Sequence, residues 1–340
     1  MRYDSRYLLT TFAVVGSLVV GACAGGSSDV VGGQPPTGEG EGLVLVSYAV
    51  PKNGWDAIEV AFSEGEDGDS SAINADYGPS GNQSRKVVDG APADIVNFSV
   101  EPDMTRLVEA GKVDEDWDSG AYGGVPFGSV VTLVVREGNP KDIRTWDDLL
   151  EPGVDVISPS PLSSGSAKWN LLAPYAAKSN GGRDRGAGLS YVEQLVSDHF
   201  PVQPESGRAA TEAFLQGQGD VLLSYENEAL LIEEMGQNVE HVDLAETFRI
   251  DNPVAVVNTS SQLDKANELN DFLYTEKGQR VWADEGFRPV DPAIAAEYSE
   301  KFHTPETLHT IDELGGWDIV DTELFGDNGA ITEIYEESTR

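Results

Sequence analysis

The chain has 340 residues, of which 59 are acidic and 22 are basic, and its formal net charge at pH 7 is −37. Nucleic acid is a poor partner for such a chain and none is expected, because its recognition depends on basic patches that neutralise phosphates. The hydrophobic fraction of 39% is ordinary for a globular protein. The excess of acid concerns solubility rather than fold, and it fits a high-salt habitat and an acidic lineage equally well.

The first 22 residues have the pattern of an export signal. Arg2 and Arg6 precede an apolar run from Leu8 to Val20. This run is shorter than the roughly 20 apolar residues that a membrane-spanning helix needs, and its length suits a signal peptide. It ends in Val-Gly-Ala-Cys23, which resembles a bacterial lipobox, where the cysteine is acylated and begins the mature chain.

Cys23 is the only cysteine in the sequence, so an internal disulfide is excluded. We therefore expect a lipoprotein signal peptide over residues 1–22 and a lipid anchor at Cys23. The anchor would hold the protein on the extracytoplasmic face of the cell membrane. Residues 23–41, rich in Gly, Ser and Pro, are expected to form a flexible linker.

From Leu43 onward, predicted strands alternate with predicted helices, which indicates an α/β protein with parallel sheets flanked by helices. A body of about 300 residues is long enough for two domains. Strands are expected at 43–50, 73–77, 94–99, 129–136, 154–158, 220–225 and 252–258. Helices are expected at 53–62, 82–89, 102–111, 145–150, 189–198, 226–235 and 260–284.

The stretch from Ser158 to Asn170 combines a strand end, a Pro-rich turn, a Ser/Gly cluster and the start of a helix. An ordinary capped helix is one interpretation, because serine is a preferred N-cap residue. The other is an anion site, because a helix N-terminus presents unpaired N–H groups and the positive end of the helix dipole.

Three more loops, at 47–50, 78–83 and 206–209, are rich in small or polar residues and are each expected to join a strand to a helix. Ligands of open α/β sheets gather at the carboxyl ends of strands. The loops at 47–50, 78–83, 163–166 and 206–209 therefore suggest one polyatomic anion held by uncharged donors.

Several long segments resemble the sulfate-binding proteins of ABC importers. They are SYAVPKNGW (47–55), GPSGNQSRKVVDGAPADIV (78–96), VVREGNPKDIRTWDDLLEPGVDVISPSPLSSGSAKWN (134–170), GDVLLSYENEALL (219–231), PVAVV (253–257), FRPVDPAIA (287–295) and GGW (315–317). The resemblance extends from about Leu43 to Tyr335.

This resemblance implies a two-lobed periplasmic-binding-protein-like fold of type II, each lobe a mostly parallel sheet flanked by helices, with the ligand in the cleft. Lobe 1 would contain residues 42–130 and 253–340, and lobe 2 residues 131–252. The crossings between lobes are expected at Val130–Arg136 and Pro253–Val257.

The resemblance also implies ligand contacts. Ala49 would use its backbone N–H, where the family usually has Asp. Ser80 matches the serine of the family's Gly-Gly-Ser-Gly turn, although Pro79 replaces a glycine. Ser164, Gly165 and Ser166 match its Ser-Gly-Gly, so a hydroxyl and two amides are retained and Ser166 adds a hydroxyl.

Two further contacts depart from the family pattern. The family's Gly-Ala-Arg loop is one residue shorter here, so its amide would come from either Gly207 or Arg208. Arg208 could equally be a solvated surface arginine. The family tryptophan before Glu-Asn-Glu is Tyr225, a phenol that both donates and accepts. Tyr225 as a packing residue outside the contact shell is the alternative.

The implied function is an extracytoplasmic solute-binding protein, a monomer without cofactor or metal. It would deliver sulfate, thiosulfate or, behind these, molybdate to ABC permease subunits after its lobes close. A site with donors only favours a fully ionised dianion over protonated phosphate, because an unpaired buried group costs roughly 1–3 kcal/mol.

Catalysis has little support in the sequence. The four histidines show no paired metal-ligand spacing. A Ser-x-x-Lys motif would need serine at Gly165, three residues before Lys168. The alternative function is a cell-surface hydrolase with Ser164 or Ser166 as nucleophile and Lys168 as base.

The acidic run 114–120 lacks the glycine and glutamate of a calcium loop, so we expect a solvated turn.

Overall fold

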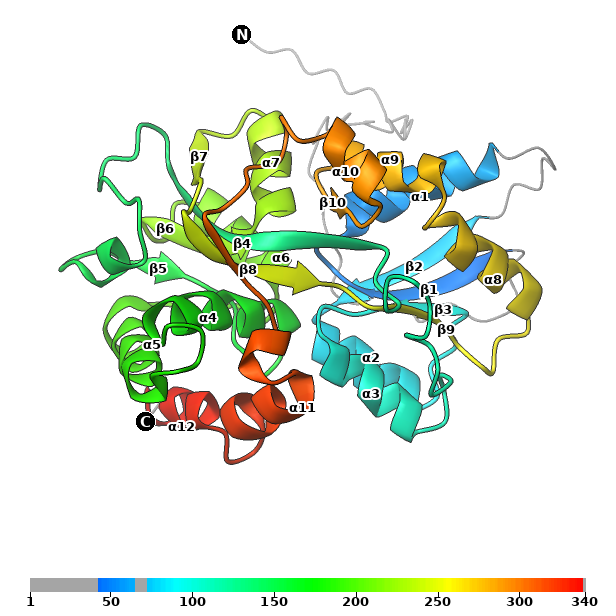
Figure 1. Ribbon diagram of the computed structural model, residues 1–340, viewed down its shortest axis with the longest axis horizontal. Coiled ribbons are helices and arrows are strands. Elements are labelled where there is room, and N and C mark those ends of the chain that lie inside the picture. Colours follow the sequence, from blue (N-terminus) through cyan, green and yellow to red (C-terminus); the bar gives the residue numbers. More distant parts are fainter. Residues whose placement is uncertain (1–41, 65–71, 339–340) are drawn as a thin grey trace, which may run out of the picture. The chain divides into compact units, whose positions relative to one another are not determined.

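The computed structural model describes residues 42–64 and 72–338 (Figure 1). The export signal, Cys23 and the linker all lie outside these residues. Among the helices in the described ranges, none is both long and apolar enough to cross a membrane.

The first sheet has four strands in the order β2-β1-β3-β9. β1 (Leu43–Tyr48) pairs in parallel with β2 (Ile73–Gly78) and with β3 (Ile95–Asn97). β9 (Val254–Val256) runs antiparallel to β3. β1 is buried along its whole length because its alternate side chains enter two apolar clusters, one on each face of the sheet.

Helices cover both faces of this sheet (Figure 1). One apolar cluster includes side chains of α1 (Lys52–Ser63), α8 (Leu263–Phe272) and α9 (Glu276–Asp284). The other includes side chains of α2 (Ser80–Val88) and α3 (Glu101–Glu109). A single helix was predicted over 260–284. Two form instead, because the Thr275 hydroxyl accepts the Gly278 N–H and caps a new start.

The second sheet is centred on the long strand β4 and has the path β11-β8-β4-β6-β5, with β7 and β10 also paired to β4. Its strands are β4 (Phe127–Arg136), β5 (Val156–Ile157), β6 (Val221–Tyr225), β7 (Val239–Val242), β8 (Glu246–Asp251), β10 (Arg288–Pro289) and β11 (Thr307–His309). The mostly parallel sheets expected from the sequence are mixed sheets, because β4 is antiparallel to β6, β7, β8 and β10.

Two chain segments cross between the sheets. β4 begins at Phe127 in the core of the first sheet and continues as a strand of the second, and the run from β8 to β9 returns. Gly128–Val130 and Arg249–Asp251 pair antiparallel where the two segments pass each other. Both segments overlap or adjoin the crossings expected from the sequence.

The second sheet is also covered on both faces. Its helical elements are η1 (Asp147–Leu150), α4 (Gly165–Lys178), α5 (Arg185–His199), α6 (Gly207–Leu215) and α7 (Glu226–Glu234). Side chains of α4 and α5 share the largest apolar cluster with β4, and those of α6 and α7 pack on the opposite face with β5 and β6. β7 and β8 were not expected from the sequence, whereas α6 follows the loop at 206–209 that was expected to open a helix.

The C-terminal segment packs with the second sheet's core, whereas the sequence analysis placed residues 253–340 together in lobe 1. The segment includes η2 (Asp312–Leu314), α11 (Trp317–Val320), η3 (Asp321–Phe325) and α12 (Ala330–Ser338). Trp317 meets Trp169 of α4 edge to face, with ring centroids 4.8 Å apart. Lys168 Nζ lies 2.5 Å from Asp321 Oδ1. Of the elements after residue 253, β9, α8 and α9 belong to the first sheet and its core, and α10 (Pro292–Glu297) packs on α9 and β10.

Candidate anion site

The first-lobe side of the candidate site lies at the carboxyl ends of three neighbouring parallel strands. Ala49 follows β1, Ser80 follows β2 and Ser99 follows β3. Because the strands are parallel and in adjacent positions, these residues meet at one edge of the sheet. The sequence pointed to the first two loops and missed Ser99.

The second-lobe side comes from the ends of β5 and β6. Ser164, Gly165 and Ser166 stand between β5 and α4, and Tyr225 is the last residue of β6. The expected strand–loop–helix pattern is wrong for the fourth loop, because Ser206 follows irregular backbone after α5 rather than a strand. It still opens a helix, α6.

Two glycines bring the loops into direct contact. A Cβ placed on Gly165 would lie 2.8 Å from Ser99 Cβ and 2.9 Å from Ser99 Oγ. A Cβ placed on Gly207 would lie 2.9 Å from Ser166 Oγ and 3.0 Å from Val50 Cγ2. Only glycine allows such close approach. The predicted contact loops of the two lobes therefore converge on one place.

The N-terminus of α4 has a serine N-cap whose side chain does not cap the helix. Ser164 occupies the N-cap position and accepts no helix N–H. Its Oγ instead lies 2.7 Å from Ser166 Oγ, and both side chains are buried. The first-turn N–H groups of a helix have no intrahelical acceptor. In α4 they remain available as donors.

The Ser80 hydroxyl already has partners within the protein. It donates to Asp103 Oδ2 at 2.6 Å and accepts the Ser99 N–H at 2.9 Å. Its proton is therefore used to join α2 to α3, and the donor that α2 can offer is backbone N–H. The N-cap of this helix, Pro79, makes no side-chain cap.

Arg208 is a partly buried bridge rather than a solvated surface arginine. Its Nη2 donates to the Val50 carbonyl oxygen at 3.4 Å, and the same nitrogen lies 3.3 Å from Glu228 Oε2. The Glu228 side chain is 1% exposed, and neither of its oxygens has a hydrogen-bond partner. The guanidinium charge is thus matched by a carboxylate within the protein.

Tyr225 lies among the predicted contact residues. Its side chain is 1% exposed, and its Oη lies 2.8 Å from Ser99 Oγ. Burial raises the pKa of the phenol well above its ordinary value, so it keeps its proton at neutral pH. The hydroxyl can donate and accept, as the sequence predicted.

Ser99 is the residue that links most of these groups. Its carbonyl oxygen accepts from Trp169 Nε1 at 2.7 Å and from Asn252 Nδ2 at 3.0 Å. Ser99 and Asn252 were both missed by sequence reasoning. Their one available signal was position, because Ser99 ends a predicted strand and Asn252 begins one.

Lys168 and three of the four histidines, the candidate bases for a serine nucleophile, form bonds to other groups. Lys168 is paired with Asp321, away from Ser164 and Ser166. Three histidines have other partners: His199 bonds the Val154 carbonyl, His241 bonds Glu233, and His309 bonds Glu246 and Glu313. None of these bonds reaches the serine cluster.

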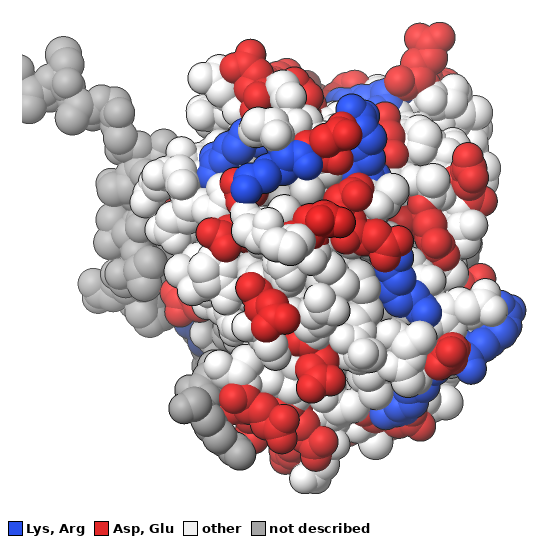
Figure 2. Space-filling view, turned by 90° about the vertical axis from the view of Figure 1, so that its left-hand side faces the viewer, with Lys and Arg blue, Asp and Glu red and all other residues white. Residues whose placement is uncertain are grey.

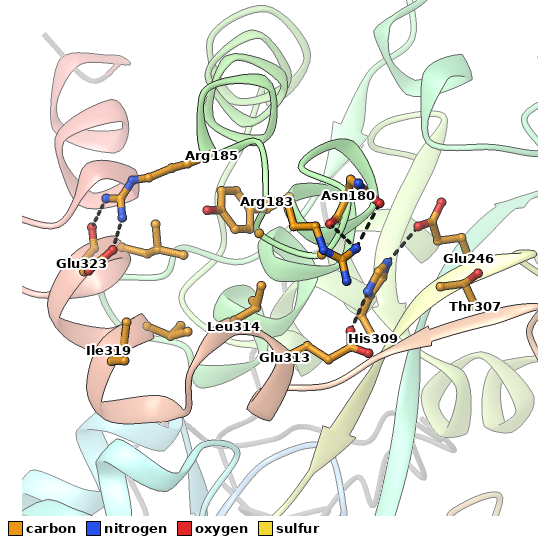
Figure 3. Close-up of a pocket in the computed structure, with 15 residues that line it drawn as sticks. Asn180, Arg183, Arg185, Glu246, Thr307, His309, Glu313, Leu314, Ile319 and Glu323 are labelled. Atoms are coloured by element: carbon orange, nitrogen blue, oxygen red, sulfur yellow. Dashed lines mark hydrogen bonds and ion pairs between the residues drawn. The ribbon is translucent and has the colours of Figure 1, made fainter.

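A separate cavity of about 700 Å³ lies between the turn after α4, β11 and the C-terminal helices (Figure 3). His309, 6% exposed, bonds Glu246 Oε1 at 2.8 Å and Glu313 Oε2 at 2.9 Å. Arg185 is paired with Glu323 on the other side of the same hollow. None of the predicted contact residues lines it. Its charged groups tie the C-terminal segment to the second sheet.

Acidic residues outnumber basic ones by 59 to 22. Figure 2 shows them spread over one face, with basic side chains lying beside them. Individual basic residues form ion pairs with these acids, such as Lys178 with Asp147 at 2.6 Å and Lys141 with Asp220 at 3.6 Å. Repulsion of an approaching anion is screened beyond about 8 Å at physiological salt, so affinity depends on short-range donors.

Two α/β lobes, joined by paired crossover strands and facing each other through donor-rich loops, define the class of extracellular solute-binding proteins. A family model described as a bacterial extracellular solute-binding protein matches residues 43–288. The chain belongs to this family and, within it, to the sulfate-binding proteins. These are binding proteins of transport systems and not enzymes.

Individual relatives support this assignment. The solved structure of the sulfate-binding protein SubI from Mycobacterium tuberculosis is 58% identical, covers 84% of this chain and 100% of its own, and superposes with a TM-score of 0.83. The sulfate-binding protein of Synechococcus elongatus is 33% identical over 94% of this chain and 93% of that relative. The thiosulfate-binding protein of Pseudomonas aeruginosa is 32% identical over 86% of this chain and 92% of that relative.

Proposed function

We propose that this chain captures sulfate between its two lobes and delivers it to the permease of an ABC importer. The observation that carries the proposal is the uncapped N-terminus of α4. Its first-turn N–H groups have neither an intrahelical acceptor nor the Ser164 hydroxyl as partner. They adjoin Ser99 and the Gly207 loop from other elements. A helix N-terminus of this kind suits an anion.

The proposed contacts are the eight positions expected from the sequence. Backbone N–H groups would come from Ala49, Ser80, Gly165, Ser166 and either Gly207 or Arg208, and hydroxyls from Ser164, Ser166 and Tyr225. The Ser206 hydroxyl takes the Ala209 N–H at 3.1 Å, which leaves the two preceding amides of α6 for the ligand. Both amides remain candidates.

The charge balance of these groups favours a fully ionised dianion. The guanidinium of Arg208 is matched by Glu228, so the donors around the anion are uncharged. Backbone dipoles then meet the charge of the anion at short range. Sulfate is therefore the first proposed ligand, thiosulfate the second and molybdate the third.

The two lobes are proposed to close around the anion by a hinge motion. Contacts between the two sides at the site include those from Trp169 Nε1 to the Ser99 carbonyl, from Tyr225 Oη to Ser99 Oγ, and from Arg208 to the Val50 carbonyl. We assign residues 42–130 and 253–306 to the first lobe. Residues 131–252 and 307–338 go to the second, because the C-terminal segment shares its core.

A lipid anchor at Cys23 is proposed from the pattern of residues 1–23, with the folded body outside the cytoplasm. Cells fed a labelled fatty acid should incorporate the label into the wild-type chain. Replacement of Cys23 by serine should abolish the incorporation. Equal labelling of the two chains would overturn the anchor without affecting the binding site.

Calorimetric titration of the full chain with sulfate, thiosulfate, molybdate, tungstate and phosphate tests the binding function. We expect saturable binding of sulfate, with thiosulfate next, and no turnover. Absence of binding by all five anions would overturn the proposal. Covalent labelling of Ser164 or Ser166 by a serine-directed reagent would favour a hydrolase.

A further inference from the structure

Two hydroxyls from opposite lobes meet beside the N-terminus of α4. Ser99 Oγ and Tyr225 Oη are 2.8 Å apart, and both side chains are nearly inaccessible to solvent. Ser99 follows β3 of the first sheet, whereas Tyr225 ends β6 of the second. Ser99 Oγ also lies 2.9 Å from the position that a Cβ of Gly165 would take. The two hydroxyls therefore adjoin the proposed anion contacts.

Counting protons shows what this hydroxyl pair can offer. Each hydroxyl has one proton and two lone pairs. The bond between them uses one proton and one lone pair, so one proton and three lone pairs remain. Asn252, whose Nδ2 bonds the Ser99 carbonyl oxygen, also approaches the phenol. Even if Asn252 donates to the phenol, the pair keeps one donor and at least two acceptor positions.

The backbone of Ser99 is held by hydrogen bonds from three parts of the chain. The Ser99 N–H donates to Ser80 Oγ at 2.9 Å. The Ser99 carbonyl oxygen accepts from Trp169 at 2.7 Å and from Asn252 at 3.0 Å. These bonds come from the first lobe, the second lobe and the crossover segment. They fix the backbone of Ser99, so the Cβ that carries the hydroxyl stays beside the anion contacts.

We propose that Ser99 and Tyr225 form a specificity-determining hydroxyl pair that offers a bound tetrahedral oxyanion both a donor and an acceptor. The inference rests on the proposed anion-binding function and deepens it. A site with N–H donors alone leaves the O–H of hydrogen phosphate unpaired, which lowers its affinity. The hydroxyl pair accepts that O–H, so the chain binds singly protonated tetrahedral oxyanions in addition to sulfate.

The decisive variant replaces this pair by a single group that can only donate. Ser99→Ala combined with Tyr225→Trp replaces two hydroxyls by one indole N–H, which donates and cannot accept. Sulfate and phosphate are titrated calorimetrically into the full chain at about pH 8, where phosphate is mainly the singly protonated dianion. We expect the affinity for phosphate relative to sulfate to fall by about 10- to 100-fold.

Single variants separate this mechanism from a change of shape. Ser99→Ala and Tyr225→Phe each leave one hydroxyl, which still donates and accepts, so the phosphate-to-sulfate ratio should stay within about threefold of wild type. The near-isosteric double variant Ser99→Ala with Tyr225→Phe removes both hydroxyls. It should lose about tenfold more affinity for phosphate than for sulfate.

Ser224→Ala is the matched control, because Ser224 precedes Tyr225 on β6 and its alternate position directs its side chain to the other face of the sheet. It should leave both affinities unchanged. An unchanged phosphate-to-sulfate ratio in both double variants would overturn the role of the pair, as would wild-type chain that binds sulfate and no phosphate. Failure of wild-type chain to bind sulfate would instead overturn the proposed function.

Discussion

Two helices with a serine at the N-cap reach the candidate site, and their first turns are arranged differently. Ser206 of α6 accepts the Ala209 N–H at 3.1 Å, as an ordinary N-cap does. Ser164 of α4 accepts no helix N–H and faces Ser166 instead. The same residue type at the same helical position therefore stabilises one helix and leaves the other with free donors.

The difference comes from what surrounds each serine. A hydroxyl two residues further along α4 competes for the Ser164 side chain, whereas the equivalent position in α6 is Arg208, which bonds elsewhere. α4 is also held from outside, by Trp317 against Trp169 and by Asp321 against Lys168. External packing can replace the stabilisation that a cap would supply.

Trp317→Ala should have the largest effect on stability, because it removes the packing that supports α4. Trp317 is 4% exposed, and loss of such a buried side chain costs about 3–5 kcal/mol. Urea denaturation should show this fall in the free energy of unfolding. Ile319→Ala, on the same short helix but 47% exposed, should cost less than about 0.5 kcal/mol. Equal losses in the two variants would contradict this support for α4.

Gly165→Ala should nearly abolish sulfate binding. The new Cβ would lie 2.8 Å from Ser99 Cβ, so the first turn of α4 or the Ser99 loop must shift. We expect affinity to fall by about 100-fold or more, since displaced donors each contribute to holding a charged ligand. Calorimetry gives the measurement. Gly186→Ala, in the first turn of α5, has room for its Cβ and should bind as wild type does.

Ser206→Ala should mainly lower stability, whereas Ser164→Ala should mainly lower the affinity for sulfate. Ser206→Ala removes a side-chain cap and should lower the free energy of unfolding by about 1 kcal/mol, with little change in affinity. Ser164→Ala removes no cap and should leave stability nearly unchanged, while sulfate affinity falls about tenfold. Thermal melts and calorimetry on both variants distinguish the two helices. Similar losses of stability would show that Ser164 does act as a cap.

A third helix, α3, begins with the carboxylate of Glu101. The pH dependence that this group gives to the free energy of unfolding should be the smallest of the expected effects. Burial, and then the charges of Asp118, Asp318, Asp312 and Asp251, raise the pKa of Glu101 above its ordinary 4.5. A raised carboxyl pKa means that the stability it contributes is present below about pH 4.5 and is lost as the pH rises through the raised value.

Glu101→Gln should therefore melt a little higher than wild type at neutral pH, and the advantage should disappear toward pH 4.5. Melting temperatures across this interval test the sign. Glu109→Gln, at the other end of the same helix, is the matched control. A variant that melts lower than wild type at neutral pH would reverse the expected sign.

Much of this architecture could be predicted from local pattern. Strand and helix periods located most of the elements, and small polar residues after strands located the loops at Ala49, Ser80 and Ser164. Long shared segments pointed to the sulfate-binding proteins, an assignment that the relatives confirm. The lipid anchor at Cys23 stays a prediction, since it lies outside the described residues. These features depend on residues that are close together in the sequence.

The tertiary structure decided what each donor does. The Ser80 proton goes to Asp103, 23 positions away, and Tyr225 meets Ser99 across 126 positions. The C-terminal segment joined the second core, and the second sheet became mixed through pairings with β4. Sequence pattern records which side chains can form hydrogen bonds. Only the packing of distant segments determines which partner each one takes, and therefore which donors remain for an anion.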